Sequence, residues 1–367
     1  MKVLIVEKHA APYRDDTFRE FMNKTKAEVL IFSEIKGDQH NHSEWNYTSC
    51  MQDFRKFAKG RIAWKVDYYR KGYLKCLLDF KPDVVVTPSV IEGKLAKIFL
   101  KARVVCTADT VKKGRYAKQK WNQVLRTWMY RQCDAWWIPG YAGEEYFREF
   151  LGSDHPIYHG SYTNDAVTLN QKMQEYRAEK DMYRKEIGVL PDEFLFLFVG
   201  KMIPTRHIEV LLNAMKQLPN EMKIKFLCIG NGPDFEKAKE YSKQDSRLIL
   251  IPSVPLKELE KYYAIADAYL HPGEEPYSLA LYEAAIAGIP MLSSNKVGAV
   301  YDCLENGKNG YIFAFCNAED LREKIQMMYN GKLDPKDVKA KQTFILTQRG
   351  TDWAAKELAK ACGISLK

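Results

Sequence analysis

The chain has 367 residues, which is enough for two domains that each bury a core of their own. Apolar residues make up 46% of it, and no run of about 18 apolar residues is present that could cross a bilayer. The eight cysteines are scattered without a Cys-x-x-Cys pair, which argues against a disulfide framework or a zinc site. This cysteine usage indicates reduced thiols in a cytoplasmic protein.

The net charge of +9 is unevenly distributed along the chain. Residues 1–163 hold 28 Lys and Arg against 19 Asp and Glu, whereas the remainder holds 28 of each kind. Two basic segments rich in aromatic residues, 55–75 and 112–131, lie in the first half. Such segments suit a peripheral helix lying on anionic lipid headgroups. They could equally bind an acidic polymer or nucleic acid, or form solvated helix faces whose aromatic side chains reach the core.

In the first half, short apolar runs alternate with longer amphipathic ones. This rhythm predicts a parallel sheet with helices on both faces. The predicted strands are residues 3–6, 29–32, 84–87, 104–106 and 135–138. The predicted helices are residues 17–24, 53–80 (with a break) and 93–100.

A polar, charged stretch at residues 164–186 interrupts the rhythm, which restarts with the buried strand 194–200. Further strands are predicted at residues 223–229, 248–251, 268–270, 290–293 and 310–313, and helices at residues 208–217, 256–264 and 318–329. We therefore predict an α/β protein of two doubly wound, Rossmann-like domains facing across a cleft, with ligands bound there at the carboxyl ends of the strands. The predicted parts are an N-terminal domain at 1–165, a C-terminal domain at 187–345, and a last helix, 346–367, that returns to the N-terminal domain.

The segment 271–290 is the most informative part of the sequence. A helix is predicted to begin near Ser278 and to end at Gly288, so that Glu275 precedes it and Glu283 lies about one and a half turns inside it. Free backbone N–H groups at the start of the helix form an anion site between the two carboxylates. This combination suits a ligand with hydroxyls and phosphates, such as a nucleotide sugar. Acidic residues are common near helix N-termini, however, so this segment alone does not distinguish a ligand site from an ordinary helix start. The neighbouring motifs are needed for that distinction.

Other loops at strand ends carry suitable groups. Lys201 and Arg206 flank the loop after strand 194–200, where they could neutralise a diphosphate. Gly230 and Asn231 open a tight turn after the next strand, which would let a ligand approach the backbone closely. Taken singly, each motif could be an ordinary turn or surface charge.

In their order along the chain, these motifs resemble the retaining glycosyltransferases of family 4, which have the GT-B fold. The specific part is the Glu-x7-Glu spacing from Glu275 to Glu283, and the resemblance covers residues 187–330 well and the first half loosely. It implies that Lys201 and Arg206 hold the donor pyrophosphate. It also implies that Glu283 binds the ribose hydroxyls and Glu275 a hydroxyl of the transferred sugar.

The resemblance further implies that the backbone around Tyr277–Leu279 meets the phosphates or the sugar, and that the loop of Ser253 and Val254 meets the base. The expected donor-binding residues are Glu283, Lys201, Arg206, Gly230, Asn231, Ser253, Val254, Tyr277, Ser278 and Leu279. The chain departs from the family pattern because lysine precedes arginine and His207 replaces a usual glycine. These departures bear on sugar specificity and catalytic detail.

In the first half, Pro12, Tyr13 and Arg14 are similar to a loop of bacterial polysaccharide-assembly members, which implies that they line the acceptor side. The histidine that the family often carries after the fourth strand of this domain is absent. Asp109 is the nearest ionisable group at that strand tip. The candidate catalytic residues are Glu275, Lys201, Arg206 and Asp109.

The expected reaction moves a sugar from a nucleotide-diphosphate sugar to a saccharide or lipid-linked saccharide, with retention, in bacterial-type polysaccharide or glycolipid assembly. A nucleotide-sugar 2-epimerase and a non-catalytic binding partner with the same fold are the alternatives. No acidic metal cluster is evident, so neither a metal nor a cofactor is expected beside the donor. An anionic membrane surface is a further candidate partner through the basic first domain, and nucleic acid is not expected. The expected location is the cytoplasm, with peripheral attachment to the inner face of the membrane as an option.

Overall fold

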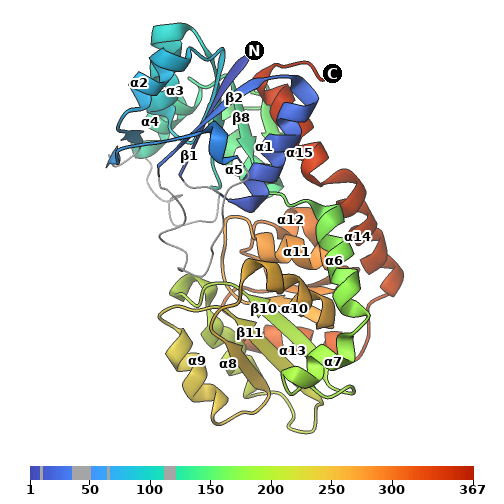
Figure 1. Ribbon diagram of the computed structural model, residues 1–367. Helices are drawn as coiled ribbons and strands as arrows, with labels where there is room; N and C mark the ends of the chain where they lie inside the picture. Colours follow the sequence, from blue (N-terminus) through green and yellow to red (C-terminus); the bar gives the residue numbers. More distant parts are fainter. Residues whose placement is uncertain (9–10, 35–50, 64–66, 111–120) are drawn as a thin grey trace. The chain divides into compact units, whose positions relative to one another are not determined.

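The computed structural model describes residues 1–8, 11–34, 51–63, 67–110 and 121–367. The chain forms two compact units (Figure 1). Unit 1 consists of Met1–Asp165 and Arg349–Lys367, and unit 2 of Ala166–Gln348. Among the residues that the structure describes, no helix combines the length and the apolar character needed to span a bilayer.

In its described residues, unit 1 has a seven-stranded parallel sheet with the order β3-β2-β1-β6-β7-β8-β9. A small antiparallel pair, β4 with β5, lies outside this sheet. The strands are β1 Lys2–Glu7, β2 Glu28–Ser33, β3 Arg55–Phe57, β4 Arg61–Ala63, β5 Tyr68–Arg70, β6 Val84–Thr87, β7 Arg103–Thr107, β8 Ala135–Ile138 and β9 Ile157–His159.

Helices cover both faces of this sheet because its strands alternate their apolar side chains between two cores. Val3 and Ile5 of β1 pack with helices α1 (Pro12–Thr25) and α15 (Thr351–Cys362), whereas Leu4 and Val6 pack with the helices of the other face. The helices of that other face are α2 Tyr73–Phe80, α3 Val90–Leu100, α4 Trp121–Tyr130 and α5 Tyr141–Leu151.

Unit 2 has a six-stranded parallel sheet with the order β12-β11-β10-β13-β14-β15. Its strands are β10 Phe194–Val199, β11 Ile224–Ile229, β12 Leu248–Ile251, β13 Ala268–His271, β14 Met291–Ser294 and β15 Gly310–Phe313. Its helices are α6 Ala166–Arg177, α7 Lys180–Glu186, α8 Ile208–Met215, α9 Phe235–Ser242, α10 Leu259–Ile265, α11 Leu279–Ala287, α12 Val300–Cys303, α13 Ala318–Tyr329 and α14 Pro335–Gln348.

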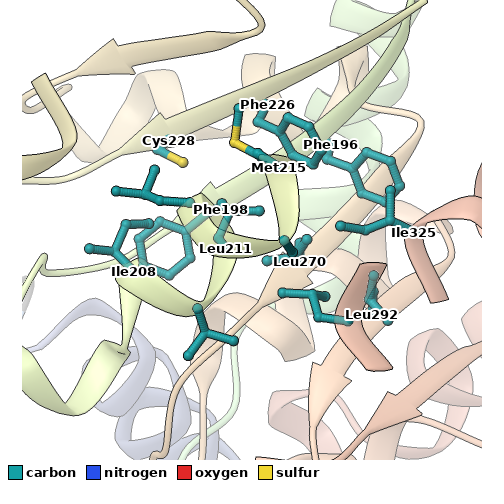
Figure 2. Packing of buried hydrophobic residues seen from close by; sticks show 14 of the residues in the cluster. Phe196, Phe198, Ile208, Leu211, Met215, Phe226, Cys228, Leu270, Leu292 and Ile325 are labelled. Atoms are coloured by element: carbon teal, nitrogen blue, oxygen red, sulfur yellow. The ribbon is translucent and has the colours of Figure 1, made fainter. Parts of the chain in front are cut away.

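The strand β10 is buried on both faces, as its continuous apolar run predicts. Phe196 stacks on Phe226 of β11 with ring centroids 5.4 Å apart, and this core continues into α8 and α13 (Figure 2). On the opposite face, Tyr269 of β13 stacks on Tyr263 of α10. Two parallel sheets, each in a Rossmann-like unit, confirm the predicted α/β fold class.

The predicted helix at 53–80 is confirmed only for its last eight residues, Tyr73–Phe80, and is wrong before them. This segment forms a short 3₁₀ turn (Gln52–Phe54), the strands β3, β4 and β5, and only then the helix α2. Buried ion pairs override the local helical pattern, because Arg55 binds Glu7 and Asp15, and Arg70 binds Glu92. Two arginines of the basic segment 55–75 are therefore buried, and the segment is no peripheral helix. Residues 64–66 of it lie outside the described residues.

The interruption predicted at 164–186 is instead the pair of helices α6 and α7, which belong to unit 2. Their arginines explain the attachment. Arg177 donates to the carbonyl oxygen of Ala287 over 2.8 Å. The buried Arg184 donates to the carbonyl oxygen of Ile265 over 2.9 Å and pairs with Asp267. This charged segment packs against unit 2 because its arginines donate hydrogen bonds to the carbonyl oxygens of the last residues of α10 and α11.

Candidate functional site

Close backbone contacts lock together the loops at the carboxyl ends of β10 and β11. A Cβ atom on Gly230 would lie 1.8 Å from the carbonyl oxygen of Gly200, and one on Gly232 would lie 2.3 Å from that of Met202. The Met202 N–H donates to the carbonyl oxygen of Asn231 over 2.9 Å. The lack of a side chain at Gly230 is therefore needed for the close approach of the neighbouring loop.

The loop after β13 is held on both sides in the same way. A Cβ atom on Gly273 would lie 2.4 Å from Cα of Arg206, and one on Gly298 would lie 1.9 Å from the carbonyl oxygen of Pro276. The Glu274 N–H donates to the carbonyl oxygen of Thr205 over 2.8 Å, and the Gly298 N–H donates to that of Glu275 over 2.9 Å. The backbone that carries Glu275 is consequently fixed by its neighbours.

The side chain of Glu275 lies between two nitrogen groups. Arg206 pairs with Oε1 of Glu275 through Nη2 and donates through Nη1 to the carbonyl oxygen of Glu274 over 2.9 Å. His271, at the end of β13, places Nε2 3.1 Å from Oε2 of Glu275. Each carboxylate oxygen therefore has its own partner. The carboxylate is still 25% exposed, which leaves it accessible to a ligand.

The environment favours the charged form of Glu275. Burial raises the pKa of this carboxyl, but hydrogen bonds with His271 and Ser278 and the charge of Arg206 together hold the pKa below its usual value. Burial lowers the pKa of His271, against the opposing effect of Glu275. His271 is only 1% exposed, so it serves as a neutral donor through its Nε2–H group.

The helix α11 begins beside this carboxylate. Ser278 is its N-cap, and its hydroxyl accepts from the N–H of Leu281 over 3.3 Å. The N–H groups of Leu279 and Ala280, which precede that of Leu281, are those an anion could reach. Tyr277 and Ser278 are themselves buried, so this tip offers mainly backbone. Gly288 ends the helix in the left-handed conformation.

Glu283 is half-buried on α11 and has a neighbour that the sequence did not single out. The phenol of Tyr263 interacts with Glu283, and burial, followed by the charge of Glu283, raises the pKa of Tyr263 well above its usual value. The hydroxyl of Tyr263 also donates to the carbonyl oxygen of Ala280 over 3.2 Å. Tyr263 thus supports both Glu283 and the start of α11. Nothing in the sequence indicated this role, because Tyr263 looks like an ordinary aromatic core residue of a helix.

The other predicted donor residues lie at the same edge of the sheet. Lys201 is exposed and is the second residue after β10, and Asn231 is the second residue after β11. Ser253, half-buried, and Val254, buried, follow β12. The carboxyl ends of four adjacent strands of unit 2 therefore carry the predicted residues, as the parallel order requires.

In unit 1, the structure brings the predicted acceptor residues together through a residue that sequence reasoning missed. Arg14 donates through Nη2 to the hydroxyl of Tyr162 over 3.2 Å, and that hydroxyl donates to Oδ2 of Asp109 over 3.4 Å. The rings of Tyr13 and Tyr162 meet edge to face with centroids 5.2 Å apart. Pro12 is the first residue of α1, so these residues form a helix start where a loop was expected.

A buried charge cluster lies beneath Arg14. Its Nη1 lies 3.8 Å from Oε2 of Glu7, and Glu7 also pairs with Arg55, which pairs in turn with Asp15. Burial raises the pKa of Glu7, although Arg55 and Arg14 oppose the rise. Burial alone would lower the pKa of Arg14, but Tyr13, Tyr162 and Glu7 raise it, so Arg14 stays charged.

Of the basic segment 112–131, residues up to 120 lie outside the described residues, and 121–130 form α4. Within the described ranges, no three His, Cys, Asp or Glu side chains are placed so that they could hold a metal ion.

Comparison with known proteins points to one family. Residues 179–343, a little under half of the chain, match the family model of the group 1 glycosyl transferases. The chain is 26% identical over 189 residues to spore coat protein SA of Bacillus subtilis, a match that covers 48% of this chain and 47% of that protein. The chain thus spans about half of the length of that relative, and 35% of an uncharacterised glycosyltransferase of Methanocaldococcus jannaschii.

Solved structures share the fold over nearly the whole chain. A glycosyltransferase from Rickettsia africae superposes with a TM-score of 0.77 at 13% identity, covering 98% of this chain and 97% of that one. HepE of Anabaena, in complex with UDP-glucose, superposes with a TM-score of 0.74 at 12% identity, covering 99% of each chain. The chain therefore has the fold of GT-B glycosyltransferases, and its second unit contains a region similar to the group 1 glycosyl transferases.

Proposed function

We propose that this protein transfers a sugar from a nucleotide-diphosphate sugar to a saccharide or lipid-linked saccharide, as a retaining glycosyltransferase of family 4 in polysaccharide or glycolipid assembly. The observation that carries the proposal is the fixed carboxylate of Glu275, which lies between Arg206 and His271 at the start of α11. It lies within the region that matches the group 1 family. The UDP-glucose complex of HepE, a protein with the same fold, adds support for the donor class.

The donor roles follow from charge and position. The diphosphate leaving group gains negative charge as the glycosidic bond breaks, and preorganised cations and helix N-termini stabilise such charge. Arg206, Lys201 and the first N–H groups of α11 supply these. Glu275 accepts a hydrogen bond from a sugar hydroxyl because its carboxylate stays ionised, and Glu283 accepts from the ribose. Arg206 can serve the diphosphate and Glu275 together, since its guanidinium has five N–H donors.

On the acceptor side, we assign Tyr13, Arg14 and Asp109 to binding of the incoming saccharide, with Tyr162 joining them. Asp109 is exposed at the strand tip, so its carboxylate is free to accept from an acceptor hydroxyl on the side away from Tyr162. We further propose that the protein is located in the cytoplasm and attaches to the inner face of the membrane.

The first experiment offers UDP-, GDP-, ADP- and dTDP-sugars and measures nucleotide release with and without a lipid-linked saccharide fraction. We expect release from one donor class, dependent on acceptor, and a product that keeps the anomeric configuration of the donor. Epimerised sugar without acceptor would support the 2-epimerase instead, and no turnover with any donor would support a binding partner.

Substitutions in unit 2 then test the assigned roles. We expect Glu283→Ala to raise the donor Kd at least about tenfold, because a hydrogen bond to a charged group contributes roughly 1.5–3 kcal/mol. We expect Lys201→Ala and Arg206→Ala to lower kcat by about a hundredfold, as the loss of one transition-state donor does. Exposed Lys332→Ala in the same unit is the control. Wild-type rates in all three variants would overturn the assignment.

We further propose turnover without a metal ion, with Lys201 and Arg206 supplying the positive charge that the leaving diphosphate requires. An excess of EDTA is expected to leave the transfer rate unchanged. A loss of rate that Mg²⁺ restores would show that the cationic side chains do not suffice.

A further inference from the structure

The outer face of α3 and α4 in unit 1 exposes an unusual number of large apolar side chains. Both helices cover the same face of the sheet through their inner sides, and Figure 1 shows them together on that side. The side chain of Val124 is 79% exposed and that of Trp128 is 52% exposed. Among the side chains of these two helices that the structure describes, the exposed large apolar ones are Ile98, Phe99, Val124, Leu125 and Trp128.

The side chains of Ile98, Val124 and Trp128 form one face, as their spacing along each helix and one contact between the helices show. Lys94, Ile98 and Lys101 follow each other at four and three residues along α3 and its C-cap, so they lie on one side of that helix. Val124 and Trp128 are four residues apart on α4. The Nζ atom of Lys94 lies 4.4 Å from the ring centroid of Trp128, which joins the two stripes.

The charge of this face is positive. Lys94 and Lys101 are exposed on α3, and Arg131 is exposed directly after α4. The acidic residue of α3, Glu92, is buried in an ion pair with Arg70 and contributes no surface charge. The neighbouring helix α5 exposes Glu145 and Glu149, which mark the acidic border of the basic face.

We propose that this α3–α4 face docks on the surface of an anionic lipid bilayer. Apolar tips that reach the acyl boundary and long cationic side chains at headgroup level are the two attractions that hold a peripheral protein there. The face fits RNA less well, because base stacking needs open aromatic rings. Three of the five exposed apolar side chains, Ile98, Val124 and Leu125, have no ring, and Lys94 lies over the ring of Trp128. The inference deepens the proposed function in one respect: such a surface would present a lipid-linked acceptor.

Vesicle flotation of the full chain tests the proposal. The vesicles are phosphatidylcholine alone, or with about a third phosphatidylglycerol to supply the negative surface potential. The apolar variant is Ile98→Ser with Trp128→Ala, and the charge variant is Lys94→Gln with Lys101→Gln. The matched controls lie in unit 2, where Leu190 is 59% exposed and Lys332 is exposed: Leu190→Ser and Lys332→Gln.

We expect the wild type to float with the anionic vesicles, and more weakly at high salt because the charges are screened. The apolar variant should partition about tenfold less, and the charge variant about 25-fold less, at roughly fivefold for each lysine. Equal binding to neutral vesicles, no binding, or equal loss in the controls would overturn the proposal. So would face-dependent binding to an RNA homopolymer with no vesicle binding.

Donor binding by the same proteins separates this proposal from the proposed function. Both face variants should keep the wild-type Kd for the nucleotide sugar, because their substitutions lie outside unit 2. Wild-type protection of β1, β6 and β7 in hydrogen exchange shows separately that unit 1 of each variant is folded. If no protein binds a nucleotide sugar, the proposed function fails while the vesicle result still decides the docking surface. A face variant that binds the donor and floats like the wild type refutes the docking surface alone.

Discussion

At the scale of single residues, Glu275 and Tyr162 show how one group can be positioned by several elements. Glu275 has Arg206 on one oxygen and His271 on the other, and these partners come from the loop after β10 and from the end of β13. Tyr162 joins Arg14 to Asp109. In both cases at least one partner is distant along the chain: Arg206 lies 69 residues from Glu275, and Arg14 lies 148 residues from Tyr162.

The buried His271 predicts a pH dependence of stability. Its folded pKa lies below the usual value of 6.5, so the unfolded chain binds more protons between the two values. Stability from this group is therefore complete above about pH 6.5 and falls as the pH drops towards the folded pKa. We expect urea unfolding to show a smaller loss between about pH 7.5 and pH 5.5 in His271→Gln than in the wild type.

The glutamine in that variant keeps an N–H donor for Glu275 but does not titrate. His155 and His159, whose pKa values are also lowered by burial, remain in both proteins and cancel in the comparison. Identical pH profiles in the two proteins would contradict the assigned role of His271.

The bridging hydroxyl of Tyr162 predicts a selective kinetic effect. Tyr162→Phe keeps the ring contact with Tyr13 but leaves Arg14 and Asp109 without their link. We expect the acceptor KM to rise about fivefold, because loss of both hydrogen bonds loosens Arg14 and Asp109 and weakens acceptor binding by about 1 kcal/mol, with the donor KM unchanged. Tyr141→Phe, which removes another hydroxyl of unit 1 bound by an arginine, is the control. Equal effects in the two variants would remove Tyr162 from the acceptor site.

At the scale of elements, the glycines that follow the strands of unit 2 allow the backbones of neighbouring loops to lie in contact. The sequence predicted the strands because apolar runs alternate with amphipathic ones, and it predicted the start and end of α11 because Ser278 and Gly288 are local capping signals. It could not predict β3 to β5, because buried ion pairs of Arg55 and Arg70 hold that segment.

The loop contact predicts unequal costs for two glycine substitutions. Gly230→Ala should destabilise unit 2 by at least about 3 kcal/mol, because the methyl group overlaps the carbonyl oxygen of Gly200 and the loops must separate. Gly307→Ala should cost only about 1 kcal/mol, because its φ of +79° is strained for alanine but no atom lies within 4 Å of the added carbon. Denaturant unfolding measures the free energy of unfolding of both variants. Equal losses would show that the loops after β10 and β11 can separate at little cost.

At the scale of the whole molecule, the chain leaves unit 1 at residue 165 and returns to it at residue 349. The returning helix α15 buries Ala355, Leu358, Ala359 and Cys362 against the same core as Val3 of β1. Unit 1 is therefore completed by residues from the other end of the sequence, whereas unit 2 is continuous.

Truncation tests this arrangement. Removal of residues 349–367 should unfold unit 1, because it uncovers one face of the sheet, while unit 2 stays folded and binds nucleotide sugar. Hydrogen exchange should show lost protection in β1, β6 and β7 and full protection in β10 and β11. Removal of residues 365–367 alone, which lie beyond α15, is the control. Protection of β1 after the longer truncation would show that α15 is dispensable.

The sequence by itself determined the α/β fold class, the positions of the long strands, and the place of Glu275 just before a helix that starts at Ser278. These features depend on side-chain periodicity and caps, which act over a few residues. The tertiary structure alone decided the partners. Arg206 and Glu275 are 69 residues apart in the sequence, and Arg14 and Tyr162 are 148 apart. Such pairs form only when parallel strands bring their carboxyl ends to one edge of a sheet, and no local pattern encodes which side chains then meet.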